Sequence, residues 1–303
     1  MLYTCTLNPS IDYIIHVEDF VEGGLNRGKN TSYYPGGKGI NVSRVLKRLE
    51  VANTALGFLG DFTGDFIKNK LHNESIKTAF IEVDGTTRIN MKLKASDETE
   101  INGPGPDISA QQLEALYTQI RQLNAGDFLV AAGSIPSTVP ADFYVKVATI
   151  CAENGVKMVA DTSSQALKEI LGTSLFLVKP NHHELGELFD VTIKTTEDAI
   201  TYGKQLQQQG AEHVLVSMGG SGAVYISPEA CYVAKAPVGT VKNTVGAGDS
   251  MVAGFLAAYT KGKSLEDTFR YAIATGSATA FQDDLCEKKD VDALLSTIEI
   301  TKK

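Results

Sequence analysis

The amino-acid sequence predicts an α/β fold in which helices cover both faces of a mostly parallel central sheet. From about residue 53 onward, short apolar runs with strand-like composition alternate with longer segments of helical periodicity. Such alternation requires crossover connections, which place helices on both faces of one sheet. The stretch 86–102 departs from this rhythm, so we expect a small second sheet beside a three-layer sandwich.

The first fifty residues predict two strands and one helix. Leu2–Leu7 and Ile11–Val17 have strand-like composition. In Gly36–Leu49, apolar side chains recur on one helical face behind glycines at the helix entrance. Later strands are expected at TALGFLG, DFLVAAG and VKMVAD, and each is followed by a helix, at DFTGDFIKNKLHNE, 139–153 and 163–171 respectively. Beyond them we expect a helix near 197–209, the strands HVLVSM and AVYIS around the turn GGSG, and a mostly helical last third.

The stretch Thr86–Asn102 alternates apolar and polar residues around the turn Ser96–Glu98, which predicts an antiparallel hairpin. With Ile11–Val17 and Asn30–Tyr34 it is expected to form a small sheet that acts as a lid over a site. The alternative is a plain extension of the edge of the central sheet. An exposed apolar face on the small sheet would favour pairing with a second copy, so we expect a homodimer through the lid.

Length and composition indicate one globular domain spanning residues 1–303. Hydrophobic residues make up 43% of the chain and charged residues 21%, which is ordinary for a protein with a sizeable core. The formal net charge of -8 opposes binding to nucleic acid or to anionic membranes, because like charges repel. The sequence has no run of about 18 apolar residues and no secretory signal, so we expect a cytoplasmic protein.

The strongest chemical signal is the glycine-rich segment Thr244–Ser250, which directly precedes an apolar helical pattern. A glycine-rich helix entrance can direct several backbone N–H groups and the positive end of the helix dipole at one anion. Gly246 and Gly248 permit close approach of the backbone to a phosphate. Asp249, in the first turn, is placed to accept the proton of an attacking hydroxyl. The alternative is that Asp249 only stabilises the helix N-terminus.

This segment resembles the second signature of the PfkB/ribokinase family of sugar kinases, and Gly36–Asn41 (GGKGIN) resembles the first. The resemblance extends over nearly the whole chain in the correct order and includes the opening TLNPSID. It implies a ribokinase-like three-layer sandwich with a small β-sheet lid. It also implies a catalytic base and an anion hole, formed here by Asp249 and by Gly246, Ala247 and Gly248.

The same resemblance implies which residues bind the sugar. The first signature contacts the sugar in the family, which makes Gly36, Gly37 and Asn41 substrate ligands. Asp12 would bind sugar hydroxyls, since a carboxylate accepts two hydrogen bonds. Lys38 either approaches a phosphate or is a solvated lysine at a helix start.

Arginine side chains are the candidates for binding a phosphate already present on the substrate, because Arg–phosphate hydrogen bonds are strong and directional. Arg27 lies in GGLNRGKN and Arg88 in TTRINMKL, both in the expected lid segments, and this arrangement resembles the phosphosugar members of the family. A surface arginine is the alternative for each. Ser134 stays a candidate substrate contact, although GSIPSTVP departs from the family's usual GSLPPG pattern.

Two further segments resemble the nucleotide and metal site of the family. Lys179–Glu184 matches the NxxE element, which implies that Asn181 and Glu184 organise Mg²⁺ largely through water, as suits a hard cation. The loop Ser217–Gly222 resembles the ATP-phosphate loop, with a tight turn between strands as the alternative. The expected ATP-site residues are Lys179, Ser217, Gly219, Gly220, Ser221, Gly222, Asn243 and Gly248.

The resemblance thus implies a kinase that uses ATP and Mg²⁺ to phosphorylate a ketose phosphate. Four segments are most similar to members that convert fructose 1-phosphate to fructose 1,6-bisphosphate: TLNPSIDYI, GGKGINVSRVLKRL, TRIN and TEINGPGP. A tagatose-6-phosphate kinase is the alternative. A dinucleotide-dependent oxidoreductase is a rival of another class, because Gly57, Gly60 and Gly64 follow a strand, although their spacing is not GxGxxG. The intact set of motifs disfavours a catalytically silent sugar-binding protein.

Overall fold

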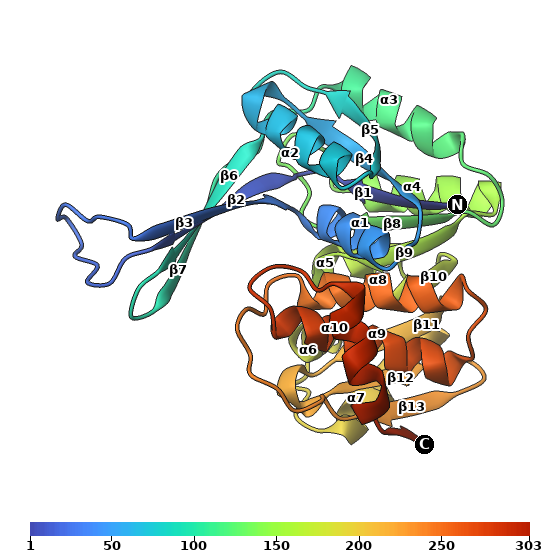
Figure 1. Ribbon diagram of the computed structural model, residues 1–303. Helices are drawn as coiled ribbons and strands as arrows, with labels where there is room; N and C mark the ends of the chain where they lie inside the picture. The colour runs from blue at the N-terminus through green and yellow to red at the C-terminus, as the bar shows by residue number, and fades with distance from the viewer.

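A large sheet runs through the molecule (Figure 1), which we describe for residues 1–303 from a computed structural model. Its strands are β1 (Leu2–Thr6), β4 (Asn53–Leu59), β5 (Lys77–Glu82), β8 (Phe128–Ala132), β9 (Lys157–Asp161), β10 (Leu175–Val178), β11 (Ala211–Ser217), β12 (Ala223–Ile226), β13 (Cys231–Ala234) and β14 (Ile300–Lys302). The order is β14-β13-β12-β11-β10-β9-β8-β1-β4-β5. The pairs from β5 to β11 are parallel, and β12, β13 and β14 continue the sheet with antiparallel pairs.

Helices cover both faces of this sheet, so the predicted three-layer α/β fold is confirmed. One face packs against α3 (Ala110–Arg121), α4 (Phe143–Asn154), α5 (Ser164–Ile170), α6 (His182–Phe189) and α7 (Thr196–Gln208). The other packs against α1 (Lys38–Arg48), α2 (Asp61–Asn73), α8 (Ala247–Tyr259), α9 (Leu265–Ala280) and α10 (Lys288–Leu294). None of these helices combines the length and the apolar character that crossing a membrane would require.

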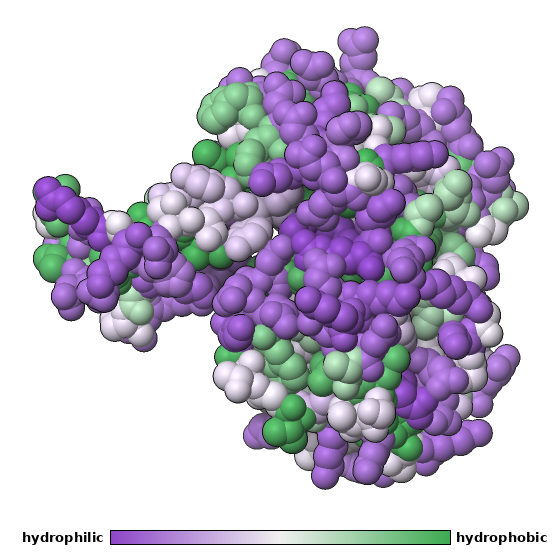
Figure 2. Space-filling model, viewed as in Figure 1, coloured by the Kyte–Doolittle hydropathy of each residue, from purple (hydrophilic) through white to green (hydrophobic).

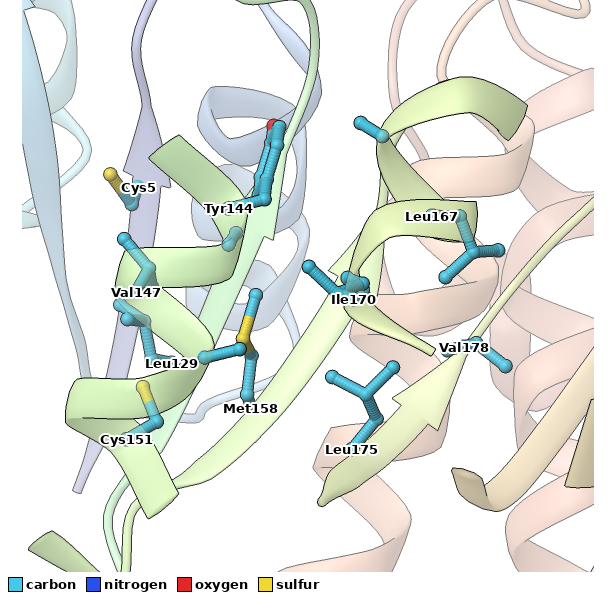
Figure 3. Packing of buried hydrophobic residues seen from close by; sticks show 14 of the residues in the cluster. Cys5, Leu129, Tyr144, Val147, Cys151, Met158, Leu167, Ile170, Leu175 and Val178 are labelled. Carbon is cyan, nitrogen blue, oxygen red and sulfur yellow. The ribbon is translucent and has the colours of Figure 1, made fainter. Parts of the chain in front are cut away.

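The two helical layers are held by side chains that alternate along each strand. In β8, Leu129 enters the core cluster on one face and Val130 enters the cluster on the other. Figure 3 shows the first cluster, in which Val147 and Cys151 of α4 pack against Leu129 and Met158 of the sheet. Each such fully buried apolar side chain stabilises the fold by about 1.5–3 kcal/mol.

Several elements were not predicted from the sequence. They are β5, α3, β10 and the edge strands β13 and β14. The last two are short, and β14 has one neighbour in the sheet, so only tertiary pairing defines it. Helix α4 begins at Phe143 rather than at Val139, after a turn in which the Pro140 carbonyl accepts a hydrogen bond from the Phe143 N–H.

A second sheet of four strands extends from the body as an arm (Figure 1). Its strands are β2 (Ser10–His16), β3 (Asn30–Gly36), β6 (Arg88–Lys94) and β7 (Glu98–Asn102), in the order β3-β2-β6-β7. Strands β2 and β6 are parallel, and the two outer pairs are antiparallel. The predicted small sheet is therefore confirmed, as a separate sheet rather than an extension of the central one.

Strand register gives this small sheet two different faces. Tyr13 lies opposite both Tyr33 and Met91, and Met91 lies opposite Ile101, so these side chains share a face. That face carries Ile11, Tyr13, Ile15, Tyr33, Ile89, Met91, Leu93 and Ile101. The opposite face carries polar side chains, among them Ser10, Asp12, Arg88, Asn90, Lys92 and Asn102.

His213 of β11 is a buried titratable residue in the core. Its Nδ1 lies 2.8 Å from the Tyr225 hydroxyl, and the rings of Phe176 and Phe255 pack beside it. Burial and the positive charge of Lys157 lower the pKa of His213 to about 4. The folded protein therefore holds this imidazole neutral.

We expect His213 to weaken the fold in acid. The unfolded chain binds a proton at the ordinary pKa of 6.5, whereas the folded chain excludes it down to about pH 4. Stability is therefore complete above pH 6.5 and falls as the pH drops toward 4. In His213→Gln, the slope of unfolding free energy against pH in this window should fall by up to about one proton.

Urea unfolding across this pH range measures that slope. His16→Gln, at an exposed position of the arm, is the matched control. An unchanged slope in the His213 variant would contradict the assignment.

Candidate functional site

A cavity of about 680 Å³ opens where β1, β8 and β9 end, between the polar face of the small sheet and the N-termini of α1 and α8. Ligands bind at this carboxyl edge of a parallel sheet in open α/β folds. In the space-filling view, hydrophilic surface covers the centre of the molecule beside the base of the arm (Figure 2). The predicted site residues that line the cavity are Asp12, Gly37, Lys38, Asn41, Arg88, Ser134, Lys179, Asn181, Glu184, Ser217, Gly246, Gly248 and Asp249.

The N-terminus of α8 presents free backbone donors to this cavity. Gly246 caps the helix with φ of 76°, in the left-handed region that favours glycine. The N–H groups of Gly246, Gly248 and Asp249 have no acceptor in the protein, whereas the N–H of Ala247 donates to the Thr244 carbonyl at 3.2 Å. The free N–H groups of this turn are therefore those of Gly246, Gly248 and Asp249, whereas the predicted anion hole comprises Gly246, Ala247 and Gly248.

Asp249 is buried in the first turn of α8. Its Oδ2 accepts a hydrogen bond from Nδ2 of Asn41 at 2.8 Å. Burial and the negative charge of Asp161 raise the pKa of Asp249 to about 7, against the opposing effects of Asn41 and nearby lysines. A carboxyl group with this pKa can both accept and release a proton near neutral pH.

Asp161, at the end of β9, holds two lysines at the cavity floor. It is 1% exposed, and its Oδ1 lies 2.9 Å from Nζ of Lys38 and 3.5 Å from Nζ of Lys179. Burial alone would raise the pKa of Asp161, but the two lysines lower it overall. Against the effect of burial, Asp161 raises the pKa of Lys38. This carboxylate therefore stays ionised and fixes two ammonium groups beside Asp249.

The small sheet contributes a second cluster of polar side chains, which is centred on Asp12. Oδ1 of Asp12 accepts hydrogen bonds from Oγ of Ser10 at 2.8 Å and from Nδ2 of Asn90 at 3.2 Å. Oδ2 of Asp12 makes no hydrogen bond in the protein. Arg88 donates through Nε and Nη2 to the carbonyl of Asn8, at 3.2 and 3.0 Å. These contacts hold one carboxylate and one guanidinium at the cavity wall.

Gly36 and Gly37 bring the chain close to these groups. A Cβ on Gly36 would lie 2.5 Å from the carboxyl carbon of Asp12, so a larger residue would displace that side chain. Gly37 has φ of 113° and caps α1, where a Cβ would lie 2.8 Å from Cγ2 of Thr6. Gly37 is therefore favoured by its backbone conformation, and glycine at position 36 leaves the Asp12 carboxylate in place.

Several buried acceptors in the cavity wall lack a partner within the protein. They are Thr6 Oγ1, Asn8 Oδ1, Asn90 Oδ1 and Asp161 Oδ2. Buried polar groups are nearly always hydrogen-bonded, so unsatisfied atoms gathered around one cavity indicate a ligand rich in hydrogen-bond donors. Sugar hydroxyl groups fit this requirement.

Sequence reasoning missed Thr6, Asn8, Ser10, Asn90, Asn102 and Asp161. Asp161 carried one available signal, since it is an acidic residue at the end of the buried run VKMVAD and such ends face ligand sites. Asn90 had none, because its role follows from its register opposite Asp12.

Asn181 and Glu184 begin α6 and cap it reciprocally. Asn181 accepts from the Glu184 N–H at 2.9 Å, and Glu184 Oε2 accepts from the Asn181 N–H at 2.8 Å. The second carboxylate oxygen of Glu184 is free of protein donors, and the side chain lines the cavity. One free carboxylate oxygen fits a cation that keeps most of its waters.

A second cavity, of about 450 Å³, adjoins the first through Ser217 and Gly248. Its lining is largely apolar and includes Val238, Met251 and Phe281. Gly219, Gly220 and Gly222 of the predicted phosphate loop line it, as does Ala247. A flat apolar group joined to a charged tail would fit the pair of cavities.

Four predicted site residues lie outside both cavities, and one of them is Gly36, which packs against Asp12. Arg27 is exposed in the loop that joins β2 to β3, and Figure 1 shows this loop at the far end of the arm. Ser221 is exposed in the short 3-10 turn Gly219–Ser221. Asn243 donates through Nδ2 to the carbonyl of Asp283 at 3.2 Å and accepts from the Val245 N–H at 3.1 Å, so it shapes the loop before α8.

The glycines that suggested dinucleotide binding serve the packing of the chain. A Cβ on Gly57 would lie 1.9 Å from the carbonyl oxygen of Thr6, and one on Gly60 would lie 2.3 Å from that of Gly85. Gly64 packs against Leu59. None of the three lines either cavity.

Comparison with known proteins finds one family and full-length relatives. The family described as pfkB family carbohydrate kinase matches residues 5–290. The chain is 54% identical over 302 residues to a 1-phosphofructokinase of Bacillus subtilis, with 100% of both chains covered. It is 42% identical over 302 residues to a D-tagatose-1-phosphate kinase of Bacillus licheniformis, with 99% of both covered. The structure of the tetrameric inhibited form of phosphofructokinase-2 from Escherichia coli aligns with a TM-score of 0.91 and 29% identity, covering 97% of this chain and 98% of that one.

We expect Asp161→Asn to lower the pKa of Asp249. The negative charge of Asp161 raises that pKa, whereas Lys38 and Lys179 lower it. Removal of the carboxylate deletes the first effect and leaves the lysines without their anionic partner, so both changes favour ionised Asp249.

A ¹³C titration of aspartate-labelled protein, with the Asp249 signal assigned by its loss in Asp249→Asn, measures the pKa. Asp65→Asn on α2, at an exposed position, should leave it near 7. A pKa that stays constant or rises in Asp161→Asn would refute the coupling.

Proposed function

The chain belongs to the pfkB family of carbohydrate kinases, and from this premise we propose that it transfers the γ-phosphate of ATP to fructose 1-phosphate and forms fructose 1,6-bisphosphate. The observation that carries the proposal is the buried Asp249 with its pKa of about 7, beside free N–H donors and two lysines. A base, an anion-binding site and a cavity wall with unpaired hydrogen-bond acceptors thus lie together.

In the proposed reaction, Asp249 accepts the proton of the substrate hydroxyl as the oxygen attacks the γ-phosphorus. The new O–P bond forms while the bond to the β-phosphate oxygen breaks, and ADP leaves with the electron pair. The N–H groups of Gly246 and Gly248 and the positive end of α8 stabilise negative charge on the transferred group. Lys38 and Lys179 add positive charge from the cavity floor, held by Asp161.

We propose that Mg²⁺ binds beside Asn181 and Glu184. A bound Mg²⁺ would neutralise phosphate charge. Glu184 supplies a free carboxylate oxygen for it or for its waters, while the reciprocal cap at Asn181 fixes the direction of that side chain.

The adjoining apolar cavity is proposed to hold the adenosine of ATP. Its contact with the first cavity at Ser217 and Gly248 would let the phosphates reach the α8 N-terminus. The glycines of the turn Gly219–Ser221 and Gly222 allow close approach of backbone to that chain of phosphates.

The choice of sugar rests on the relatives. The 54% identical relative is a 1-phosphofructokinase, and the 42% identical D-tagatose-1-phosphate kinase makes tagatose 1-phosphate the alternative. Tagatose 6-phosphate, the alternative that the sequence motifs suggested, has less support because the matching relative is named for the 1-phosphate.

An assay with Mg-ATP and fructose 1-phosphate, tagatose 1-phosphate, tagatose 6-phosphate or fructose 6-phosphate decides among these sugars. NMR of the product gives the carbon that was phosphorylated. The proposal expects the highest kcat/KM for fructose 1-phosphate and a 1,6-bisphosphate product. Preference for another sugar would replace this substrate, and absence of turnover with every sugar would reject the kinase proposal.

We expect Asp249→Asn to lower kcat by about 100-fold or more while ATP binding stays nearly unchanged. The substitution removes the proton acceptor with little change of shape. Rapid-quench kinetics and calorimetric ATP titration separate the two effects, with Asp65→Asn as control. Turnover near that of the unsubstituted protein would remove Asp249 from the role of base.

We expect Arg88→Ala to raise the KM for fructose 1-phosphate about 10-fold or more, with the KM for ATP changed less than about 3-fold. Two of its N–H groups already bind the Asn8 carbonyl, which directs the remaining guanidinium donors along the cavity wall. Lys94→Ala, farther out on the same strand, is the control. A larger effect on ATP than on the sugar phosphate would overturn this placement.

We propose that the small sheet acts as a lid over the sugar and also pairs two copies of the chain. Its polar face lines the cavity, so sugar binding would hold it there and exclude water. Its other face leaves Ile101 57% exposed and Tyr33 54% exposed in a single chain. A contiguous apolar face of this kind favours a symmetric partner.

We expect Ile101→Lys to convert a homodimer into monomers, because it places a charge in the proposed apolar interface. Phe62→Lys, which replaces another exposed apolar residue outside the small sheet, should leave the dimer intact. Sedimentation equilibrium gives both masses. A monomeric unsubstituted protein, or a dimer that survives Ile101→Lys, would exclude pairing through this face.

A further inference from the structure

The loop after α9, residues 281–286, packs directly against the segment that leads into α8. Lys242 and Asn243 donate their N–H groups to the Ala280 carbonyl at 2.9 and 3.2 Å, just before this loop. The side chain of Leu285 fills the space beside Gly246, where a Cβ would come within 2.7 Å of its Cδ2. The loop is therefore a wall that supports the turn at Gly246.

Two arginines of α1 hold this loop from its other side. Arg44 is 4% exposed and donates through Nη1 and Nη2 to the two carboxylate oxygens of Asp284, at 3.2 and 2.8 Å. Arg48 donates through Nη2 to Asp284 at 3.0 Å and through Nη1 to the Leu285 carbonyl. The planar guanidinium groups thus fix both the position and the orientation of the loop.

The same helix also touches the proposed catalytic base. Asn41, one turn before Arg44 on α1, donates to Asp249. Residues three and four apart lie on one helical face, so Asn41, Arg44 and Arg48 form a polar row directed at α8 and its supporting loop. One rigid element therefore sets Asp249 and the wall behind Gly246 relative to each other.

We propose that Asp284 is a positioning residue for phosphoryl transfer, which acts through Leu285 and Gly246 on the N–H donors at the start of α8. This rests on the function proposed above. Asp284 lines neither the 680 Å³ cavity nor the 450 Å³ cavity. It borders a pocket of about 30 Å³ that also touches Asp12 and Asn41, and a space of this size holds about one water rather than a sugar phosphate. The contribution of Asp284 is to keep the left-handed turn at Gly246 in place while charge develops on the transferred phosphate.

Because Arg44 is buried, removing the charge of Asp284 alone from their ion pair is costly. An arginine that is 4% exposed would be left with Glu74 alone if Asp284 lost its charge. Burial opposes ionisation of Asp284, yet Arg44 lowers its pKa overall. The loop would then relax, and the donors at Gly246 and Gly248 would move relative to the bound phosphate.

The test compares Asp284→Asn with Arg44→Lys, a substitution that keeps the positive charge but loses the bidentate hydrogen bonds to Asp284. We expect kcat to fall about 10- to 100-fold in each, with the KM for fructose 1-phosphate and the calorimetric affinity for ADP changed less than about 3-fold. Arg121 and Glu114 form an exposed ion pair on α3, so Glu114→Gln should leave every parameter unchanged.

A purely structural role predicts a different pattern. Val147→Ala, in the core on the opposite face of the sheet, lowers stability without touching the loop and should retain kcat at a temperature where circular dichroism shows it folded. A folded Asp284→Asn with unchanged kcat overturns the inference, as does equal loss of kcat and of ADP affinity. If instead the unsubstituted protein has no kinase activity, the proposed function itself fails. Should Asp284→Asn not fold, Arg44→Lys decides by the same criteria.

Discussion

Two buried carboxylates at the centre of the molecule share two lysine side chains unequally, and the chemistry of the cavity depends on this division. Asp161 contacts both ammonium groups, so its negative charge is stabilised despite complete burial. Asp249 has one amide donor, and burial therefore dominates its titration. Two neighbouring acids in such different surroundings lose their protons at widely separated pH. One remains an anion that organises cations, and the other exchanges protons near neutrality.

The parallel sheet makes this charge arrangement possible. Asp161 ends β9 and Lys179 follows β10, so the shared edge of two neighbouring strands brings them together. Lys38 and Asp249 come from the first turns of α1 and α8, whose N-termini face the same edge. Each group is therefore fixed by backbone elements, and little conformational entropy remains to be lost when a ligand binds.

The parts of the site that could be predicted from the sequence are those formed by residues adjacent in the chain. The glycine-rich entrance of α8 is readable because turn, helix start and Asp249 are adjacent in the chain. Asn90 was missed because strand register, which local patterns do not specify, sets its partner. Asp161 had a local signal at the end of a buried strand, but strand order brings its partner Lys179 to it. The sequence pattern does not reveal that the N–H of Ala247 already donates to the Thr244 carbonyl, which the structure shows. For the same reason the central sheet was predicted, while β14, which has one neighbour, was not.

Register also links the site to the surface of the arm. In β2 and β6, Asp12 and Asn90 point to the cavity, and the residues next to them, Tyr13 and Ile89, point away from it. Because side chains alternate strictly along a strand, a shift of one residue would turn the apolar row toward the cavity and the polar row toward solvent. The hydrogen bonds from Ser10 and Asn90 to Asp12 oppose such a shift. The register that forms the polar cavity wall therefore also places the apolar row on the other side of the same two strands, and a register shift would change both faces at once.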